Sequence, residues 1–142
     1  MANHRFQNPS TLHPTRGYSH VVEAASPSRT IYTAGQLGRT VDGRMAGAPG
    51  DFRAQAVQAF ENLKNALAAA GATFEHVVKL NNYLIDISHI HIYFEVRDRY
   101  VDTKSPPAST TIQISRLAHK ARSMRSRRSP WYRRNNTKAF KS

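Results

Sequence analysis

Apolar positions recur every three or four residues in the middle of the chain, and this spacing predicts an α-helix. We expect it to begin after Asp51, whose side chain can cap the first turn. We expect it to end before Gly71, because glycine most easily adopts the left-handed conformation found at helix ends. The apolar positions between these limits are Phe52, Ala56, Ala59, Phe60, Leu63, Leu67 and Ala70.

A second helix and four strands are expected around this element. The helix extends from Ser88, a suitable N-cap, to about Val101, and Pro106-Pro107 prevents helix beyond it. Apolar and β-branched runs predict strands at 20–25, 29–36, 76–87 and 109–116. A turn is expected at Val41-Asp42-Gly43-Arg44. We therefore predict an α+β fold of order ββαβαβ, with one sheet that carries both helices on one face.

The positive charge of the protein is concentrated in one segment. The chain has 142 residues and a formal net charge of +12. All nine acidic residues lie between Glu23 and Asp102, whereas nine of the 21 Lys and Arg residues lie between Lys120 and Lys141. Without that segment, 12 basic and nine acidic residues remain, so the rest of the chain has an ordinary balance of +3.

The chain divides into three parts by composition. Residues 1–16 are polar and patternless, and we expect a loose leader. Residues 17–118 carry the patterned elements and form one domain, and residues 119–142 form a basic tail without apolar periodicity. No apolar run is long enough to cross a membrane, no secretory signal is visible, and there are no cysteines. We expect a cytoplasmic protein without a membrane segment.

Few patterns in the sequence indicate catalytic chemistry. The seven histidines are scattered, and His89 and His91 would point to different faces of a helix, so no metal site is expected. We find no phosphate-binding loop, dinucleotide fingerprint or nucleophile elbow, and we expect no cofactor. Asp98 and Asp102 lie one helical turn apart beside Arg97, and we interpret them as part of a solvated charged face.

Asn81 and Asn82 interrupt an otherwise apolar strand. Strand interiors disfavour asparagine, so the pair calls for an explanation. Either the asparagines line a pocket, or they lie on a side of the strand that faces solvent.

Three blocks of sequence, in this order and spacing, resemble the RidA family, which is also called YjgF-like or L-PSP. The first block is Gly17-Tyr18-Ser19 followed by Ile31-Tyr32-Thr33-Ala34-Gly35-Gln36. The second runs from Gln55-Ala56 through Glu61-Asn62-Leu63-Lys64 and Ala69-Ala70-Gly71 to Val77-Val78-Lys79. The third is Pro106-Pro107-Ala108 with the strand that ends at Arg116-Leu117.

The resemblance implies a chorismate-mutase-like fold that assembles as a homotrimer, with small-molecule sites in the clefts between subunits. Active members of the family hydrolyse reactive 2-imino or enamine acids to 2-oxo acids and ammonia, without metal or cofactor. In those members an Arg after Pro-Pro-Ala holds the substrate carboxylate, and a Glu on the last strand positions the attacking water. This sequence departs from the pattern: Ser109 stands in place of the Arg, Ala34 in place of a Ser, Phe94 in place of an Asn, and the final strand is missing.

We consider two functions of different class. The first is a hydrolytic deaminase of the family's type, weakened by the uncharged Ser109. Its ligand pocket would be lined by Tyr18, Gly35, Gln36, Asn82 and Ser109, without an assigned catalytic residue. The second is a nucleic-acid-associated or RNA-cleaving protein that acts through the basic tail. Binding through nine cations weakens steeply with salt, whereas binding in a pocket need not.

The basic tail has another explanation, which would remove the nucleic-acid hypothesis. Composition changes abruptly after Leu117, and ARSMRSRRSPWYRR has the content typical of a GC-rich gene translated out of frame. One choice of codons for residues 121–133, read from the last base of the Ala121 codon, encodes AEYEIEAVAVVP. This is a strand of alternating Glu and apolar residues, as the resemblance implies for the last strand. We hypothesise that residues from about Ala121 onward are out of frame and stand in place of that strand.

Overall fold

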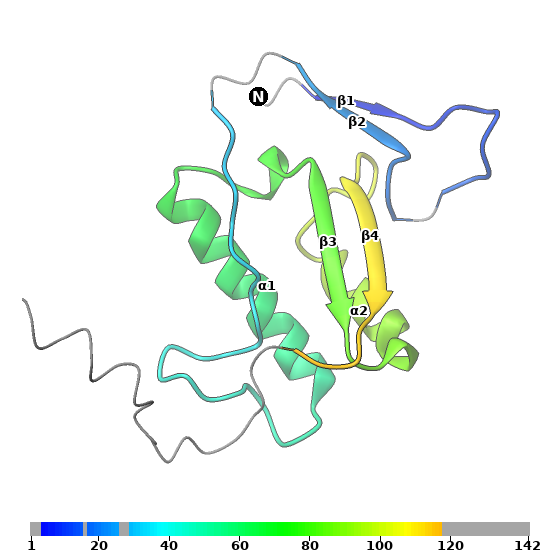
Figure 1. Ribbon diagram of the computed structural model, residues 1–142. Helices are drawn as coiled ribbons and strands as arrows, with labels where there is room; N and C mark the ends of the chain where they lie inside the picture. The colour runs from blue at the N-terminus through cyan, green and yellow to red at the C-terminus, as the bar shows by residue number, and fades with distance from the viewer. Residues whose placement is uncertain (1–3, 16, 26–28, 118–142) are drawn as a thin grey trace, which may run out of the picture.

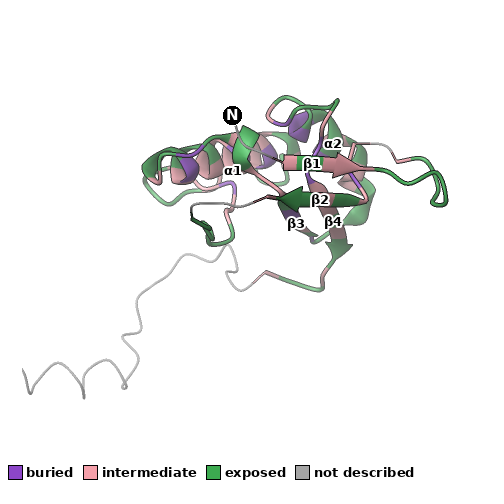
Figure 2. Ribbon diagram, turned by 90° about the horizontal axis from the view of Figure 1, so that it is seen from above, coloured by how far each residue is buried: buried purple, intermediate pink, exposed green. Residues whose placement is uncertain are grey.

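Two helices cover one face of a parallel pair of strands. The structure, a computed structural model, describes residues 4–15, 17–25 and 29–117 (Figure 1). Helices α1 (Phe52–Ala69) and α2 (Ile90–Arg97) lie on the same side of strands β3 (Lys79–Leu84) and β4 (Ala108–Gln113), as Figure 2 shows from above. The elements follow the predicted order ββαβαβ, but a strand at His4–Gln7 takes the place of the strand expected at 29–36.

The caps predicted for the long helix are present. The Asp51 carboxylate accepts a hydrogen bond from the Ala54 backbone N–H at 2.9 Å, which satisfies a donor of the first turn. Gly71 follows the last turn with a φ of 68°, a conformation that costs glycine less than any residue with a Cβ. Sequence and structure therefore agree on where α1 begins and ends.

An aromatic cluster joins the two helices and forms the centre of the core. Phe60 of α1 stacks on Tyr100, which follows α2, with ring centroids 5.0 Å apart. Its ring also contacts Tyr93 of α2 and Phe74, with centroids 6.1 and 6.0 Å away. Phe60, Tyr93 and Val96 are buried, and Val96 is 0% exposed. Aromatic pairs of this geometry stabilise beyond the area that they bury, so the cluster fixes α2 against α1.

Strands β3 and β4 are parallel neighbours, and α2 lies in the crossover between them. Leu80 lies opposite Ser109, and Tyr83 lies opposite Ile112. Side chains alternate along a strand, so Leu80 and Leu84 face the helices, where both are buried. Tyr83 and Ile112 lie on the other face and are exposed.

The first part of the fold differs from the sequence prediction. Residues 29–36 form no strand, and no backbone–backbone hydrogen bond joins 30–36 to another described residue. Strand β2 (Val21–Ala24) instead pairs with β1 (His4–Gln7), so this part of the expected loose leader is ordered, and the two form a separate antiparallel sheet. Periodicity could not reveal β1, because its only apolar residue is Phe6. The strand prediction for 29–36 is wrong because a pattern does not supply the neighbouring strand that must bond to it.

The other predicted elements are present but shorter. Strand β3 occupies the middle of the range predicted for it and is flanked by the 3₁₀ turns η1 (Phe74–His76) and η2 (Ile87–His89). Ser88 is not a cap; the Asp86 carboxylate accepts from the Ser88 N–H at 2.9 Å and starts the turn that leads into α2. The basic tail, 119–142, lies outside the described residues.

We expect Phe60→Ala to lower the free energy of unfolding by about 3 kcal/mol, because it removes the ring at the centre of the cluster and leaves a cavity. The midpoint and slope of urea denaturation measure the loss. Val41→Ala is the matched control, since Val41 is fully exposed and its truncation should change stability by less than about 0.5 kcal/mol. A loss below about 1 kcal/mol for Phe60→Ala would show that the aromatic cluster is not the core.

Candidate functional site

The amide of Asn82 is the centre of a polar cluster on the helix-facing side of the parallel strands. Its Nδ2 donates to the Ser109 Oγ at 3.1 Å, to the Thr111 Oγ1 at 3.2 Å and to the Thr110 carbonyl at 3.0 Å. Asn82 is half-buried, whereas Asn81 points to the opposite face and is exposed. The two asparagines therefore differ: Asn82 joins a polar cluster, and Asn81 faces solvent.

The hydroxyl of Tyr93, on α2, lies beside this cluster. Tyr93 is 5% exposed, and its hydroxyl lies near Ser109 but makes no hydrogen bond of good geometry with a described residue. Burial raises the pKa of Tyr93 to about 12, although Arg97 and Ser109 nearby favour the ionised form. A buried donor without a partner costs about 1–3 kcal/mol. A molecule that accepts a hydrogen bond from this hydroxyl would recover that cost.

Arg97, one helical turn after Tyr93, is a buried cation. Its side chain is 3% exposed, and its Nε and Nη2 donate to the Asp98 Oδ1 at 2.8 and 2.6 Å. The guanidinium carbon lies 4.7 Å from the centre of the Phe94 ring. Gly17 has a φ of 72°, and a Cβ there would come within 2.0 Å of the Arg97 Nη2, so a larger residue would strain the backbone and displace the guanidinium. Asp98 and Asp102 are exposed, as the interpretation of a solvated charged face expects, whereas Arg97 beside them is buried against the Phe94 ring.

The segment that carries Tyr18 is held against the loop before β4. Ser19 is 2% exposed; its N–H donates to the Pro107 carbonyl at 3.3 Å, and its hydroxyl donates to the Pro106 carbonyl at 2.7 Å. The Tyr18 hydroxyl lies 2.9 Å from the Nε2 of His13. These bonds bring the Tyr18 segment to the end of β4 at which Ser109 lies.

Gly35 and Gln36 lie elsewhere, in a shallow hollow against α1. The hollow has a volume of about 280 Å³ and is lined by Gly35, Gln36, Leu37, Arg39 and Asn62. Asn62, on α1, donates from its Nδ2 to the carbonyls of Leu37 and Arg39, both at 2.8 Å. The helix thus fixes the backbone that follows Gln36.

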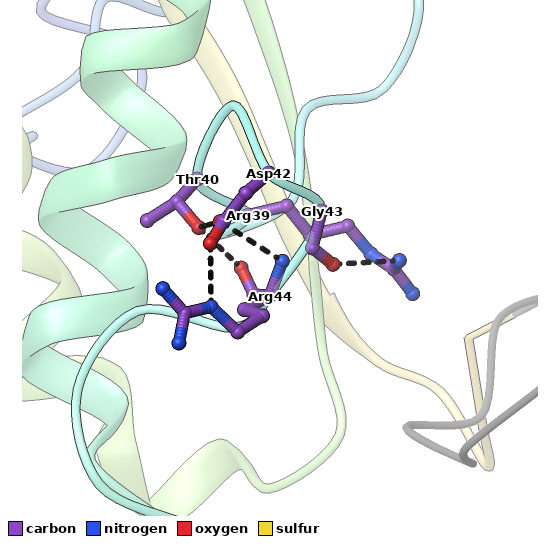
Figure 3. Close-up of polar contacts among 5 residues, drawn as sticks. All are labelled: Arg39, Thr40, Asp42, Gly43 and Arg44. Atoms are coloured by element: carbon purple, nitrogen blue, oxygen red, sulfur yellow. Dashed lines mark hydrogen bonds and ion pairs between the residues drawn. The ribbon is translucent and has the colours of Figure 1, made fainter.

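A tight turn next to this hollow positions Arg39 (Figure 3). The predicted Asp-Gly turn is present: Gly43 has a φ of 82°, and the Thr40 N–H donates to the Arg44 carbonyl at 2.9 Å. Asp42 accepts hydrogen bonds from the Thr40 hydroxyl and from the Arg44 Nε, and these bonds lower the pKa of Asp42. The Arg39 Nη1 donates to the Gly43 carbonyl at 3.2 Å. These contacts give Asp42 a structural role in the turn.

The structure unites only part of the predicted site within one chain. Asn82 and Ser109 are in contact, and the Tyr18 segment lies near the same end of β4. No described hydrogen bond joins Gly35 or Gln36 to this group.

The sequence prediction missed Tyr93 and Arg97 as members of this region. The available signal was the position of Arg97: an arginine at the helical spacing of the apolar residues of α2 is a candidate for burial. Nothing in the sequence indicated a role for Tyr93, because a tyrosine among the apolar positions of a helix is usually an ordinary core residue.

The cluster offers neutral hydrogen-bonding groups. The Ser109 and Tyr93 hydroxyls and the Asn82 amide can orient a polar ligand, and the nearby Arg97 cation is already paired with Asp98. Among the described residues, no three His, Asp or Glu side chains are grouped as a metal site requires. No helix in the described part of the chain is long and apolar enough to cross a membrane.

We expect the stability of the fold to fall at alkaline pH. Burial, with a hydrogen bond to Glu61, also raises the pKa of Tyr100 to about 12. An unfolded tyrosine ionises near pH 10. The stabilisation from keeping Tyr93 and Tyr100 neutral is therefore complete below about pH 10 and is lost as the pH rises towards 12. Urea midpoints measured between pH 7 and 12 test this.

Two variants make that test specific. Tyr93→Phe should reduce the decrease in urea midpoint between pH 10 and 12. Tyr32→Phe should leave that decrease unchanged, because Tyr32 is 91% exposed. A midpoint of the unmodified chain that stays constant from pH 9 to 12 would contradict the raised pKa values.

Known proteins of one family match this chain over most of its length. A family model described as Endoribonuclease L-PSP matches residues 8–123. Protein DfrA of Myxococcus xanthus is 38% identical over 117 residues, which cover 82% of this chain and 84% of that protein. A 2-iminobutanoate/2-iminopropanoate deaminase of Dermatophagoides farinae is 30% identical over 115 residues, which cover 80% and 85% of the two chains.

The fold leads to the same group of proteins. The crystal structure of YyfB from Yersinia pestis, a conserved Rid-family protein of unknown function, matches with a TM-score of 0.72 and 34% sequence identity. The match covers 82% of this chain and 90% of YyfB. Sequence, fold and the motifs around Tyr18 and Ser109 agree, and the chain belongs to the L-PSP family, the RidA or YjgF-like proteins.

Proposed function

We propose that this protein is a hydrolytic deaminase of the RidA type, which converts reactive 2-imino or enamine acids into 2-oxo acids and ammonia. Family membership and the deaminase name of relatives support the reaction class. The observation that carries the proposal is the contact of the Asn82 amide with the Ser109 hydroxyl, directly after Pro106-Pro107-Ala108 and beside the buried Tyr93 hydroxyl. This arrangement concentrates hydrogen-bonding groups where the family motif ends.

The reaction needs a site that holds an imine beside a water molecule. Water attacks the imine carbon and gives up one proton to the nitrogen, so a C–O bond forms and the C=N bond becomes a single bond. The remaining hydroxyl proton then moves to the nitrogen, and the C–N bond breaks as the C=O bond forms, which releases ammonia. Water is the only co-reactant. We assign ligand binding to Tyr18, Gly35, Gln36, Asn82 and Ser109, and we assign no catalytic residue.

The division of these residues into two groups suggests a pocket between subunits. Gly35 and Gln36 lie in the hollow against α1, and no described hydrogen bond joins them to Asn82 or Ser109. A pocket that uses both groups is most simply completed by a second subunit. We therefore propose a homotrimer in which the two groups meet across each subunit boundary.

The trimer should form through the outer face of β3 and β4. Tyr83, Ile85 and Ile112 are 55%, 47% and 45% exposed on or beside this face, which is more apolar than a solvated sheet needs to be. We expect sedimentation equilibrium to give a trimer at micromolar concentration. Ile112→Glu should shift the protein to monomer, and Val41→Glu should not, because Val41 is exposed elsewhere. A monomeric unmodified chain would count against the assembly and against the pocket between subunits.

The activity on 2-iminopropionate should be very weak. Ser109 cannot hold a carboxylate by charge as an arginine can, and the loss of one such contact commonly costs about 2–4 kcal/mol, roughly 30-fold to 1,000-fold in rate. A coupled assay for ammonia release measures the rate. We expect Ser109→Arg alone not to restore it, because the described residues supply no glutamate in the cluster. Rapid turnover by the unmodified chain would show that the position of Ser109 matters less than we propose.

A second candidate function is RNA cleavage or nucleic-acid binding through the basic tail. The description of the family model as an endoribonuclease favours it. The residues that would carry it lie outside the described part of the chain, so the deaminase proposal rests on more of the structure.

A further inference from the structure

The hydroxyl of Tyr18 lies within hydrogen-bond distance of an imidazole. Its oxygen is 2.9 Å from the Nε2 of His13, which comes five residues earlier in the chain. Tyr18 is half-buried, whereas His13 is exposed and can exchange protons with solvent. Tyr18 is one of the residues to which we assign ligand binding, so the group that sets the direction of its hydroxyl also affects the ligand.

A second imidazole, that of His20, holds His13 in place. The two rings lie edge to face with centroids 4.9 Å apart, and the His20 Nε2 lies 2.9 Å from the His13 carbonyl oxygen. A carbonyl oxygen only accepts hydrogen bonds, so His20 carries a hydrogen on Nε2. The His20 backbone N–H donates to the Asn8 Oδ1 at 2.9 Å. We call His13, Tyr18 and His20 the histidine cluster.

Ser19 attaches the histidine cluster to the candidate site. It lies between Tyr18 and His20 in the chain. Its N–H and its hydroxyl donate to the carbonyls of Pro107 and Pro106, in the loop that leads into β4. The backbone that carries the Tyr18 hydroxyl is therefore fixed beside the site, and the direction of the O–H depends on the imidazole next to it.

The hydrogen bond between His13 and Tyr18 can run in either direction. When the imidazole is neutral, its basic nitrogen is the better acceptor and the phenol O–H is the better donor, so the Tyr18 hydroxyl donates to the His13 Nε2. When the imidazole is protonated, both ring nitrogens are donors, so Nε2 donates and the Tyr18 O–H turns away from it. Imidazoles change between these forms between about pH 5 and 8.

We propose that His13 is a positioning residue of the ligand site and that its protonated form turns the Tyr18 O–H towards a ligand oxygen. This inference rests on the proposed function, which assigns Tyr18 to ligand binding. The ligand that fits is a small 2-oxo or 2-imino acid, whose carboxylate accepts hydrogen bonds strongly. Protonated His13 also brings a positive charge within one hydroxyl of the ligand, at a site where Ser109 supplies none.

In the described structure, no charged or titratable side chain of the neighbouring elements forms a hydrogen bond or an ion pair with the histidine cluster. Strands β1 and β2 contribute Arg5 and Glu23, which pair with each other at 3.3 Å. His4, on β1, makes no side-chain hydrogen bond to a described residue. Arg97, the cation of α2 that packs against the start of this segment, pairs with Asp98 at 2.6 Å. The groups that change charge near neutral pH beside the hydroxyl are therefore the two imidazoles of the cluster.

Binding of pyruvate, the 2-oxo acid formed from 2-iminopropionate, tests the proposal on the full chain. We expect its affinity to fall about tenfold from about pH 5.5 to about pH 8.5, because the neutral imidazole takes up the Tyr18 O–H. Isothermal titration calorimetry at constant ionic strength measures the affinity. An affinity that stays constant over this range, or no binding at any pH, would overturn the proposal.

Three variants separate positioning from a structural or purely electrostatic role. His13→Ala should bind with an affinity between the two limits and without pH dependence. Tyr18→Phe keeps the imidazole and its charge but removes the hydroxyl, so the pH dependence should disappear here too. If Tyr18→Phe keeps it, His13 acts by its charge alone and the proposal is wrong. His91→Ala is the matched control, because His91 is exposed on α2 and its loss should leave affinity and pH dependence unchanged.

The direction of the hydrogen bond can be observed without a ligand. Magnetic resonance of nitrogen-15-labelled histidine distinguishes a ring nitrogen that carries a hydrogen from one that accepts a bond. At about pH 8.5 we expect His13 to carry its hydrogen on Nδ1 and to accept at Nε2, and at about pH 5.5 both nitrogens should carry hydrogens. A neutral His13 with its hydrogen on Nε2 would contradict the proposal, because it would donate to Tyr18 in both forms.

These outcomes are distinct from the test of the deaminase, which is ammonia release. Pyruvate binding without pH dependence would remove the role of His13 and leave the proposed function standing. Binding that depends on pH in the expected way, without ammonia release, would support the role of His13 and count against the deaminase.

Discussion

The rest of the described structure depends on the packing of Phe60 against Tyr93, in α2, and Tyr100, just after it. Tyr93 and Arg97 have their positions only because α2 is fixed against α1, and α2 in turn covers the face of β3 and β4 that carries Asn82 and Ser109. The core is small, so a few aromatic rings supply much of the burial that keeps these layers together. The polar cluster is half-buried because this apolar contact holds the helix over it.

Local signals in the sequence predicted what local chemistry determines. Asp51 and Gly71 limit α1 through a hydrogen bond and a backbone conformation that involve only their neighbours. Segment 29–36 shows the opposite case, because its pattern is that of a strand but strand formation depends on a partner distant in sequence. Strand β1 could not be predicted for the same reason. It is a strand because it pairs with β2, and its own sequence has no alternating pattern.

The sequence named candidate site residues, but it could not give their arrangement. The family resemblance pointed to Ser109, and an asparagine inside an apolar strand pointed to Asn82. The parallel register places the two within hydrogen-bond distance. Tyr93 and Arg97 escaped because burial, which gives a tyrosine and an arginine their unusual properties, results from tertiary packing. The separation of Gly35 from Asn82 within one chain could not be foreseen either, because motifs carry no distances between elements.

The bond between Ser19 and Pro106 has a consequence for the order in which the protein folds. It joins residues that lie 87 positions apart, whereas the contacts among α1, β3, α2 and β4 join residues closer in sequence, such as Leu80 with Ser109 and Phe60 with Tyr100. Closing a loop of that length costs entropy that only a folded framework can offset, so we place this bond among the last to form. By the same reasoning it is among the first to open in the native state. The Tyr18 segment can then detach from the end of β4 while the helices and the parallel strands stay folded.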